Sequence, residues 1–150
     1  MARGTELVYV DTSILVPLFL HEPHSEVAAA WYARETNELV SATWCITEFA
    51  SALGIKQRRG VIDAQQAKDA WARFERLVAA DLRLLSVEPA TFHRAAELVL
   101  DASSALRAGD ALHLACAEAA GVHQMATLDD ALGRNAEVLK IRPVVLRSTL

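Results

Sequence analysis

Short runs of apolar residues alternate along the chain with longer stretches whose apolar positions recur at helical spacing. The short runs predict strands, which lie at residues 7–10, 39–41, 84–87 and 124–126, with a last one inside 138–146. The longer stretches predict helices, which cover a short segment after residue 13, then 25–35, 43–59, 63–80, 89–101 and 110–120, with a short turn or helix at 129–132. This alternation predicts a three-layer α/β/α fold with a central, mainly parallel sheet of four to five strands.

The length and composition are those of an ordinary globular domain. At 150 residues, 53% hydrophobic and 23% charged, the chain is long enough to bury a core, and we expect a single domain over residues 1–150. The formal net charge of -4 excludes a generally basic nucleic-acid binder. Phosphate groups would have to be met by a few local Arg and Lys side chains or by bound metal cations.

The cysteines and the apolar segments point to a cytoplasmic protein with no membrane association. Cys45 and Cys116 each lie inside an apolar helical pattern, which predicts two buried, reduced thiols rather than a zinc site. The apolar run at 14–20 is too short to span a bilayer, and Pro17 interrupts it. The first six residues lack the long apolar region of a signal peptide.

Four carboxylates fall where the predicted strands end or the following helices begin. Asp11 directly follows the first strand, Asp129 follows the strand at 124–126, Glu48 lies in the second turn of the helix after the second strand, and Asp110 begins a helix. In a parallel α/β sheet, functional groups gather at the carboxyl ends of the strands. These four acids can therefore share one edge of the sheet.

Each acid also has an ordinary structural interpretation. Asp11, Asp110 and Asp129 can cap helices, although Ser13 could cap the first helix equally well. Glu48 can be a solvent-exposed residue, although it borders the apolar face of its helix. At the last turn, Asp130 competes with Asp129 for the inward position. His113, one turn after Asp110, is interpreted as a packing or surface residue rather than as half of a metal-binding pair.

Taken together, the four acids favour a metal site. Carboxylates that converge without basic neighbours repel one another, and a hard divalent cation such as Mg²⁺ or Mn²⁺ removes that repulsion. Such an ion lowers the pKa of a bound water and offsets the charge of a phosphodiester. The cluster is therefore suited to metal-dependent cleavage of phosphodiester bonds.

Four motifs together make the chain resemble the PIN-domain family, and within it the VapC-type toxins of toxin–antitoxin pairs. The motifs are, in chain order, VYVDTSIL, TEFASAL, LRAGDALHLACAEAAG and MATLDDAL. The first alone is weak, whereas the third followed by Thr127-x-Asp129 is much more specific. Their order and spacing match the family over essentially the whole chain.

The resemblance implies a function and a set of site residues. It implies a metal-dependent endoribonuclease with a Mg²⁺ or Mn²⁺ cofactor, in which water, not a side chain, is the nucleophile. Its usual partners are an RNA substrate, a small antitoxin and a second copy of the chain in a homodimer. The acids correspond to the catalytic quartet Asp11, Glu48, Asp110 and Asp129, of which Asp11, Asp110 and Asp129 ligate the metal. Ser13 and Thr127 correspond to supporting hydroxyl positions, and Arg107 to a position that often carries Arg.

Further expectations concern the basic residues and the competing functions. Arg107 is expected to contact phosphate, and Lys56, Arg58 and Arg59 can hold the RNA backbone or simply form a solvated helix end. The alternatives are a PIN nuclease outside a toxin–antitoxin pair and a non-catalytic PIN-like binding module. A phosphoacceptor of the receiver type is disfavoured because no Asp follows the third strand, and a haloacid-dehalogenase-like phosphatase would need Asp in place of Ser13.

Overall fold

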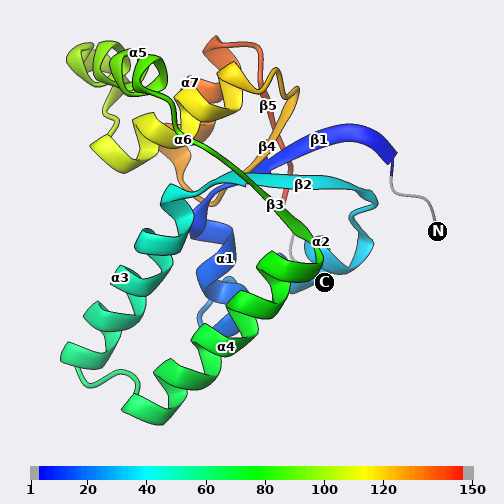
Figure 1. Ribbon diagram of the computed structural model, residues 1–150, viewed down its shortest axis with the longest axis vertical. Coiled ribbons are helices and arrows are strands. Elements are labelled where there is room, and N and C mark those ends of the chain that lie inside the picture. The colour runs from blue at the N-terminus through cyan, green and yellow to red at the C-terminus, as the bar shows by residue number, and fades with distance from the viewer. Residues whose placement is uncertain (1–3, 147–150) are drawn as a thin grey trace.

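A computed structural model describes residues 4–146 of the chain, and side chains from residue 6 onward. Five parallel strands form one sheet in the order β3-β2-β1-β4-β5 (Figure 1). The strands are β1 (Gly4–Val10), β2 (Asn37–Ala42), β3 (Leu82–Leu85), β4 (Gln124–Ala126) and β5 (Arg142–Pro143). The predicted three-layer α/β/α fold with a central parallel sheet is confirmed.

Helices cover both faces of this sheet. One face carries α1 (Thr12–Phe19), α2 (Ser25–Arg34), α3 (Trp44–Arg58) and α4 (Ala64–Ala80), and the other carries α5 (Pro89–Leu100), α6 (Ala108–Ala119) and α7 (Asp130–Val138), with a short 3₁₀ helix, η1 (Ala102–Ser104), before α6 (Figure 1). Among residues 4–146, no helix has the length and apolarity needed to cross a lipid bilayer.

The alternation of side chains along β1 divides the core in two. Val8 and Val10 pack with α1 to α4, whereas Tyr9 points to the opposite face and packs with α6. Both faces of the central strands are buried, which explains why β1 is apolar throughout its second half. Cys45 and Cys116 are buried free thiols, one in each half of the core, as the sequence predicts.

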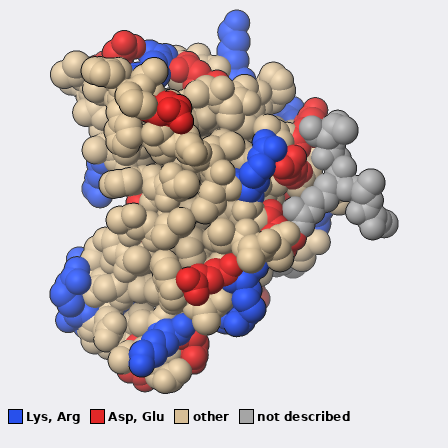
Figure 2. Space-filling model, in the orientation of Figure 1, with Lys and Arg blue, Asp and Glu red and all other residues tan. Residues whose placement is uncertain are grey.

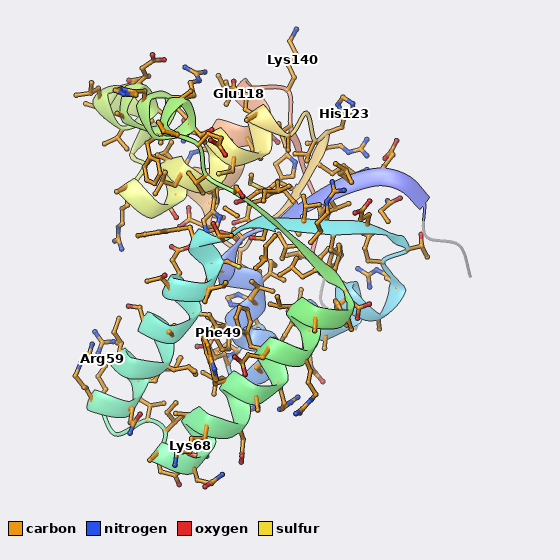
Figure 3. The ribbon with its side chains drawn as sticks, viewed as in Figure 1. Phe49, Arg59, Lys68, Glu118, His123 and Lys140 are labelled. Carbon is orange, nitrogen blue, oxygen red and sulfur yellow. The ribbon has the colours of Figure 1, made fainter. Side chains whose placement is uncertain are left out.

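An aromatic cluster fixes the hairpin that α3 and α4 form. The rings of Phe49 and Phe74 stack with their centroids 4.2 Å apart, and Phe19 meets both rings edge-on. Phe49 lies between α3 and α4 in Figure 3. Because Glu48 precedes Phe49 directly in the sequence, this packing also fixes the position of the Glu48 side chain on α3.

Several element boundaries differ from the sequence prediction, most clearly those of β3, α6 and α7. Strand β3 covers 82–85, two residues earlier than the predicted 84–87. Helix α6 begins at Ala108 rather than at Asp110, because Arg107 takes the extended N-cap conformation and Ala108 and Gly109 already belong to the first turn. The predicted short turn at 129–132 is a nine-residue helix, α7. It continues through Gly133 because Leu132 and Ala136, one turn apart, are both buried.

Candidate active site

A groove of about 490 Å³ lies between α3 and the first turn of α6. Its lining includes three of the four predicted acids and one arginine: Glu48, Asp110, Asp129 and Arg107. In the space-filling view the outline is notched between the lobe of α3 and α4 and the lobe of α5 to α7, and Lys and Arg side chains stand on both sides of the notch (Figure 2). The carboxyl ends of β1, β2 and β4 all lead to this region.

Asp11 lies beside this groove in a buried position between β1 and α1. It occupies the N-cap of α1, but its carboxylate makes no capping hydrogen bond and is only 3% exposed. Instead, Oδ1 accepts a hydrogen bond from Ser13 Oγ at 2.6 Å, and Oδ2 accepts one from Thr127 Oγ1 at 3.0 Å. The capping interpretation therefore holds for the backbone of Asp11 and fails for its side chain.

The two hydroxyl residues connect the ends of β1 and β4. Ser13 Oγ accepts a hydrogen bond from the backbone N–H of Leu128, and Thr127 Oγ1 accepts one from the backbone N–H of Asp129. Each hydroxyl thus receives a hydrogen from the segment after β4 and donates its own to Asp11. This arrangement brings Asp129 to the same strand ends as Asp11.

Burial dominates the protonation of Asp11. Desolvation raises the pKa of this carboxyl to about 6, although the charge of His113, when its imidazole is protonated, and the hydrogen bonds from Ser13 and Thr127 act to lower it. A buried carboxylate whose hydrogen-bonding partners are neutral hydroxyls is poorly compensated as an anion. A cation placed beside it would remove this cost.

Asp110 and Asp129 both line the groove, close enough for the charge of one to affect the other. Burial raises the pKa of Asp110, and the charge of Asp129 raises it further, with Glu48 adding a smaller effect. Asp129 Oδ1 accepts a hydrogen bond from the Leu132 N–H and so caps α7. Asp130, its competitor in the sequence, is exposed.

Glu48 is oriented by two hydrogen bonds to one of its oxygens. Its Oε1 accepts hydrogen bonds from Thr12 Oγ1 at 2.8 Å and from His113 Nε2. Burial acts to raise the pKa of Glu48, but the hydrogen bond from His113, the charge that this imidazole carries when protonated, and the hydrogen bond from Thr12 outweigh it and lower the pKa. The exposed-surface interpretation of Glu48 is therefore wrong, since the residue is hydrogen-bonded and more than half buried from solvent.

The residue that sequence reasoning passed over is His113. It is 1% exposed, so the packing interpretation was right and the surface interpretation wrong, but it also contacts Glu48 from behind the groove. The only sequence signal was its position one turn after Asp110 on α6, which placed it near the acids without showing what it would contact.

The basic residues divide into two groups. Arg107 lines the groove and is exposed. Arg58 and Arg59 are exposed at the end of α3, and Figure 3 places Arg59 at the tip of that helix. Eleven residues separate Glu48 from Arg59, which corresponds to about 16 Å along a helix. Lys56, by contrast, forms an ion pair with Glu22, so it is not an independent contact for a phosphate.

The donor set fits a hard divalent cation. Within residues 4–146, no three side chains of the Asp, Glu, His and Cys types lie close enough together to form a ready-made ligand set. Mg²⁺ does not require one, because it commonly uses one or two carboxylates and keeps several waters. Oxygen donors, an uncompensated buried carboxylate at Asp11 and mutual repulsion between Asp110 and Asp129 are the conditions that such an ion relieves.

Replacing Asp11 with Asn should stabilise the metal-free protein at high pH. The folded-state pKa of about 6 lies above the ordinary value of 3.8. The contribution of this carboxyl to stability is therefore fully present only below the ordinary pKa and is lost as the pH rises through 6. In urea unfolding with a chelator, we expect Asp11→Asn to gain about 1–2 kcal/mol near pH 8 and close to nothing near pH 4. The exposed Asp130→Asn should show no such difference, and an equal effect of Asp11→Asn at both pH values would contradict the assignment.

Gly109→Ala should displace Glu48. A Cβ at this position would lie 2.7 Å from Glu48 Oε2 and 3.1 Å from Trp44 Nε1, whereas at Gly54 it would meet only the mobile end of Arg58 at 3.2 Å. Gly→Ala inside a helix ordinarily stabilises by about 1 kcal/mol, which is the result we expect for Gly54→Ala. Gly109→Ala should instead lower the free energy of unfolding, as measured by urea denaturation. A similar gain for both variants would show that the space beside Glu48 is not tight.

Comparisons with known proteins identify the family. The family described as PIN domain matches residues 8–138, which is most of the chain. No curated protein sequence matches the chain.

Solved structures with the same fold have low sequence identity to this chain. VapC20 from Mycobacterium tuberculosis, a sarcin–ricin loop cleaving toxin, is 15% identical with a TM-score of 0.71 over 85% of this chain and 94% of its own. FitAcB from Neisseria gonorrhoeae is 13% identical with a TM-score of 0.65 over 91% and 95%. VapBC2 from Rickettsia felis, bound to a DNA fragment from its promoter, is 10% identical with a TM-score of 0.61 over 92% and 97%. These likenesses show a shared fold, and the match over residues 8–138 shows that the chain belongs to the PIN-domain family.

Proposed function

We propose that this chain is a metal-dependent endoribonuclease and the toxin component of a toxin–antitoxin pair. The observation that carries the proposal is the convergence of Glu48, Asp110 and Asp129 on one groove beside the buried Asp11. Family membership supports a nuclease, and PIN-domain nucleases generally use divalent metal ions. An RNA substrate and an antitoxin partner imply that the protein acts in the cytoplasm.

Asp11, Asp110 and Asp129 would hold Mg²⁺ or Mn²⁺, directly or through water, and Glu48 would orient the attacking water. When bound, such an ion lowers the pKa of water and offsets charge on a phosphodiester. Ser13 and Thr127 keep the Asp11 carboxylate fixed by their hydrogen bonds. Glu48, whose pKa is lowered, stays ionised at neutral pH and can accept a hydrogen from a water in the groove.

The basic residues suggest how an RNA backbone would lie. Arg107 is exposed at the groove, and Arg58 and Arg59 are exposed at the end of α3. With Arg107 at the scissile or a neighbouring phosphate, Arg58 and Arg59 would contact phosphates farther along the strand. The ion pair with Glu22 makes Lys56 the weakest of the proposed contacts.

The toxin role rests on the structural relatives. They include a toxin that cleaves the sarcin–ricin loop, as well as VapBC2 and FitAB bound to DNA fragments. A short neighbouring reading frame that encodes a DNA-binding segment and a charged tail, and whose product inhibits RNA cleavage by this chain, would support the pair. A chain that cleaves RNA and has no such neighbour would be a PIN nuclease of another kind.

Asp110→Asn should reduce RNA cleavage strongly and weaken metal binding. Removal of one carboxylate from a small ligand set should reduce RNA cleavage with Mg²⁺ or Mn²⁺ by at least about a hundredfold and weaken Mn²⁺ binding in calorimetry. Asp130→Asn, which changes an exposed neighbouring acid, is the matched control and should retain both properties. Unchanged cleavage in Asp110→Asn would refute the mechanism. Absence of Mn²⁺ binding at millimolar concentration in the parent chain would favour a non-catalytic binding module.

A homodimer is the other proposed assembly. Three large apolar side chains of α5 are exposed, namely Phe92, Val99 and Leu100 at 50%, 39% and 83%, and they line an apolar hollow of about 400 Å³ against α6. Leu100→Glu should convert a dimer to a monomer in light scattering, because it places a charge in a desolvated contact. Val138→Glu, at an exposed apolar position on α7, should leave the dimer intact. A parent chain that is monomeric at all concentrations tested would dismiss the proposal.

A further inference from the structure

A chain of buried hydrogen bonds reaches Glu48 from the interior of the sheet. The backbone N–H of Ala42 donates to Tyr9 Oη at 3.1 Å, Tyr9 Oη lies 2.6 Å from His113 Nδ1, and His113 Nε2 contacts Glu48 Oε1. Tyr9 and His113 are 0% and 1% exposed, and their rings meet edge-on. The three side chains come from β1, α6 and α3, so the chain of contacts crosses the core and ends at the groove.

The partners determine the direction of each hydrogen bond. The Ala42 N–H uses one lone pair of Tyr9 Oη, and burial raises the pKa of Tyr9 well above its ordinary value, so the phenol keeps its hydrogen. Glu48 Oε1 is a carboxylate oxygen and can only accept, so His113 Nε2 carries a hydrogen. In the neutral imidazole Nδ1 is then bare, and it accepts the Tyr9 hydrogen. The tautomer assigned from this network has its hydrogen on Nε2, where it is donated to Glu48.

This donation separates the roles of the two oxygens of Glu48. Oε1 receives hydrogen bonds from both His113 Nε2 and Thr12 Oγ1. Oε2 is the atom that lies against the first turn of α6, where a Cβ on Gly109 would come within 2.7 Å of it. Since Oε1 is occupied from behind, Oε2 is the oxygen directed toward the turn that carries Asp110.

Packing alone does not account for a histidine at this position. His113 lies in a run of seven buried residues on α6 whose other members are all apolar. A buried imidazole is costly unless both of its nitrogens are hydrogen-bonded. Here one nitrogen is matched to Tyr9 and the other to Glu48, an acid of the groove.

We propose that His113, oriented by Tyr9, is a positioning residue that fixes the Glu48 carboxylate with Oε2 alone available to the groove. The proposal rests on the proposed nuclease function, since it assigns His113 to the same site. His113 itself does not contact the substrate. Its effect is to restrict Glu48 to one orientation before substrate arrives, which is the usual role of a hydrogen-bonding partner behind a functional carboxylate.

The first test measures the tautomer directly in the metal-free protein. Nitrogen-15 NMR of the five histidines should show one residue, absent from the spectrum of His113→Asn, with hydrogen on Nε2 and a bare Nδ1. Glu48→Gln should shift its Nε2 resonance, and Tyr9→Phe should shift its Nδ1 resonance. Hydrogen on Nδ1 in the parent protein, or no response to Glu48→Gln, would overturn the proposal.

The second test uses two substitutions, each of which places an amide nitrogen where one of the two imidazole nitrogens lies. The amide nitrogen of Gln can reach the place of Nε2 and donate to Glu48, whereas that of Asn reaches only the place of Nδ1 beside Tyr9. We expect His113→Asn to lower kcat for RNA cleavage by about ten- to a hundredfold with KM little changed, and His113→Gln to retain kcat within about threefold. The exposed His93→Asn is the control and should behave as the parent does.

The outcomes separate a positioning role from a structural one. A purely structural histidine would make kcat follow thermal stability, so that Asn and Gln variants of similar melting temperature would lose activity equally, and that result would overturn the proposal. If the parent chain cleaves no RNA, the proposed function fails, while the NMR responses to Glu48→Gln and Tyr9→Phe still decide whether His113 holds Glu48.

Discussion

The constraint on which this structure depends is the burial of negative charge at the edge of a parallel sheet. Both faces of the central strands are covered by helices, so the acids of the groove lie at strand ends and helix starts rather than inside the sheet. Asp11 lies at such an end, 3% exposed, with the hydroxyls of Ser13 and Thr127 as its hydrogen-bonding partners. Hydroxyl groups orient a carboxylate but do not neutralise its charge. Burial therefore raises the pKa of Asp11 to about 6, and a cation beside the carboxylate would remove this cost.

The fold could be read from the sequence because its signals are local. The run before Asp11 is apolar since β1 is buried on both sides, and Asp63 predicted the start of α4, where it forms a capping box with Gln66. Two errors concern helix ends. Helix α6 begins two residues before Asp110 because Arg107 takes the N-cap conformation, and α7 continues past Gly133 because both Leu132 and Ala136 are buried. No periodicity in so short a segment distinguishes a turn from a helix of nine residues.

The site was predictable only in part, for a different reason. Topology alone brings Glu48, Asp110 and Asp129 to one groove. Functional groups gather at the carboxyl ends of parallel strands, and locating those ends requires only the order of strands and helices. Which neutral or basic side chain then meets each acid depends on contacts between distant segments. His113 lies 65 residues from Glu48 and Glu22 lies far from Lys56 in sequence, so neither the hydrogen bond between His113 and Glu48 nor the ion pair between Lys56 and Glu22 could be predicted from the sequence.

The acids of the groove are therefore not equivalent before any ion binds. Hydrogen bonds from His113 and Thr12 lower the pKa of Glu48, whereas burial raises that of Asp11, and burial with the charge of Asp129 raises that of Asp110. Glu48 thus keeps its charge while its neighbours hold their protons more tightly. As the pH falls, protons would therefore compete with a divalent cation at Asp11 and Asp110 before they compete at Glu48. This difference is consistent with the proposal that Asp11 and Asp110 hold the ion. Glu48, fixed by its own hydrogen bonds, would then orient the water.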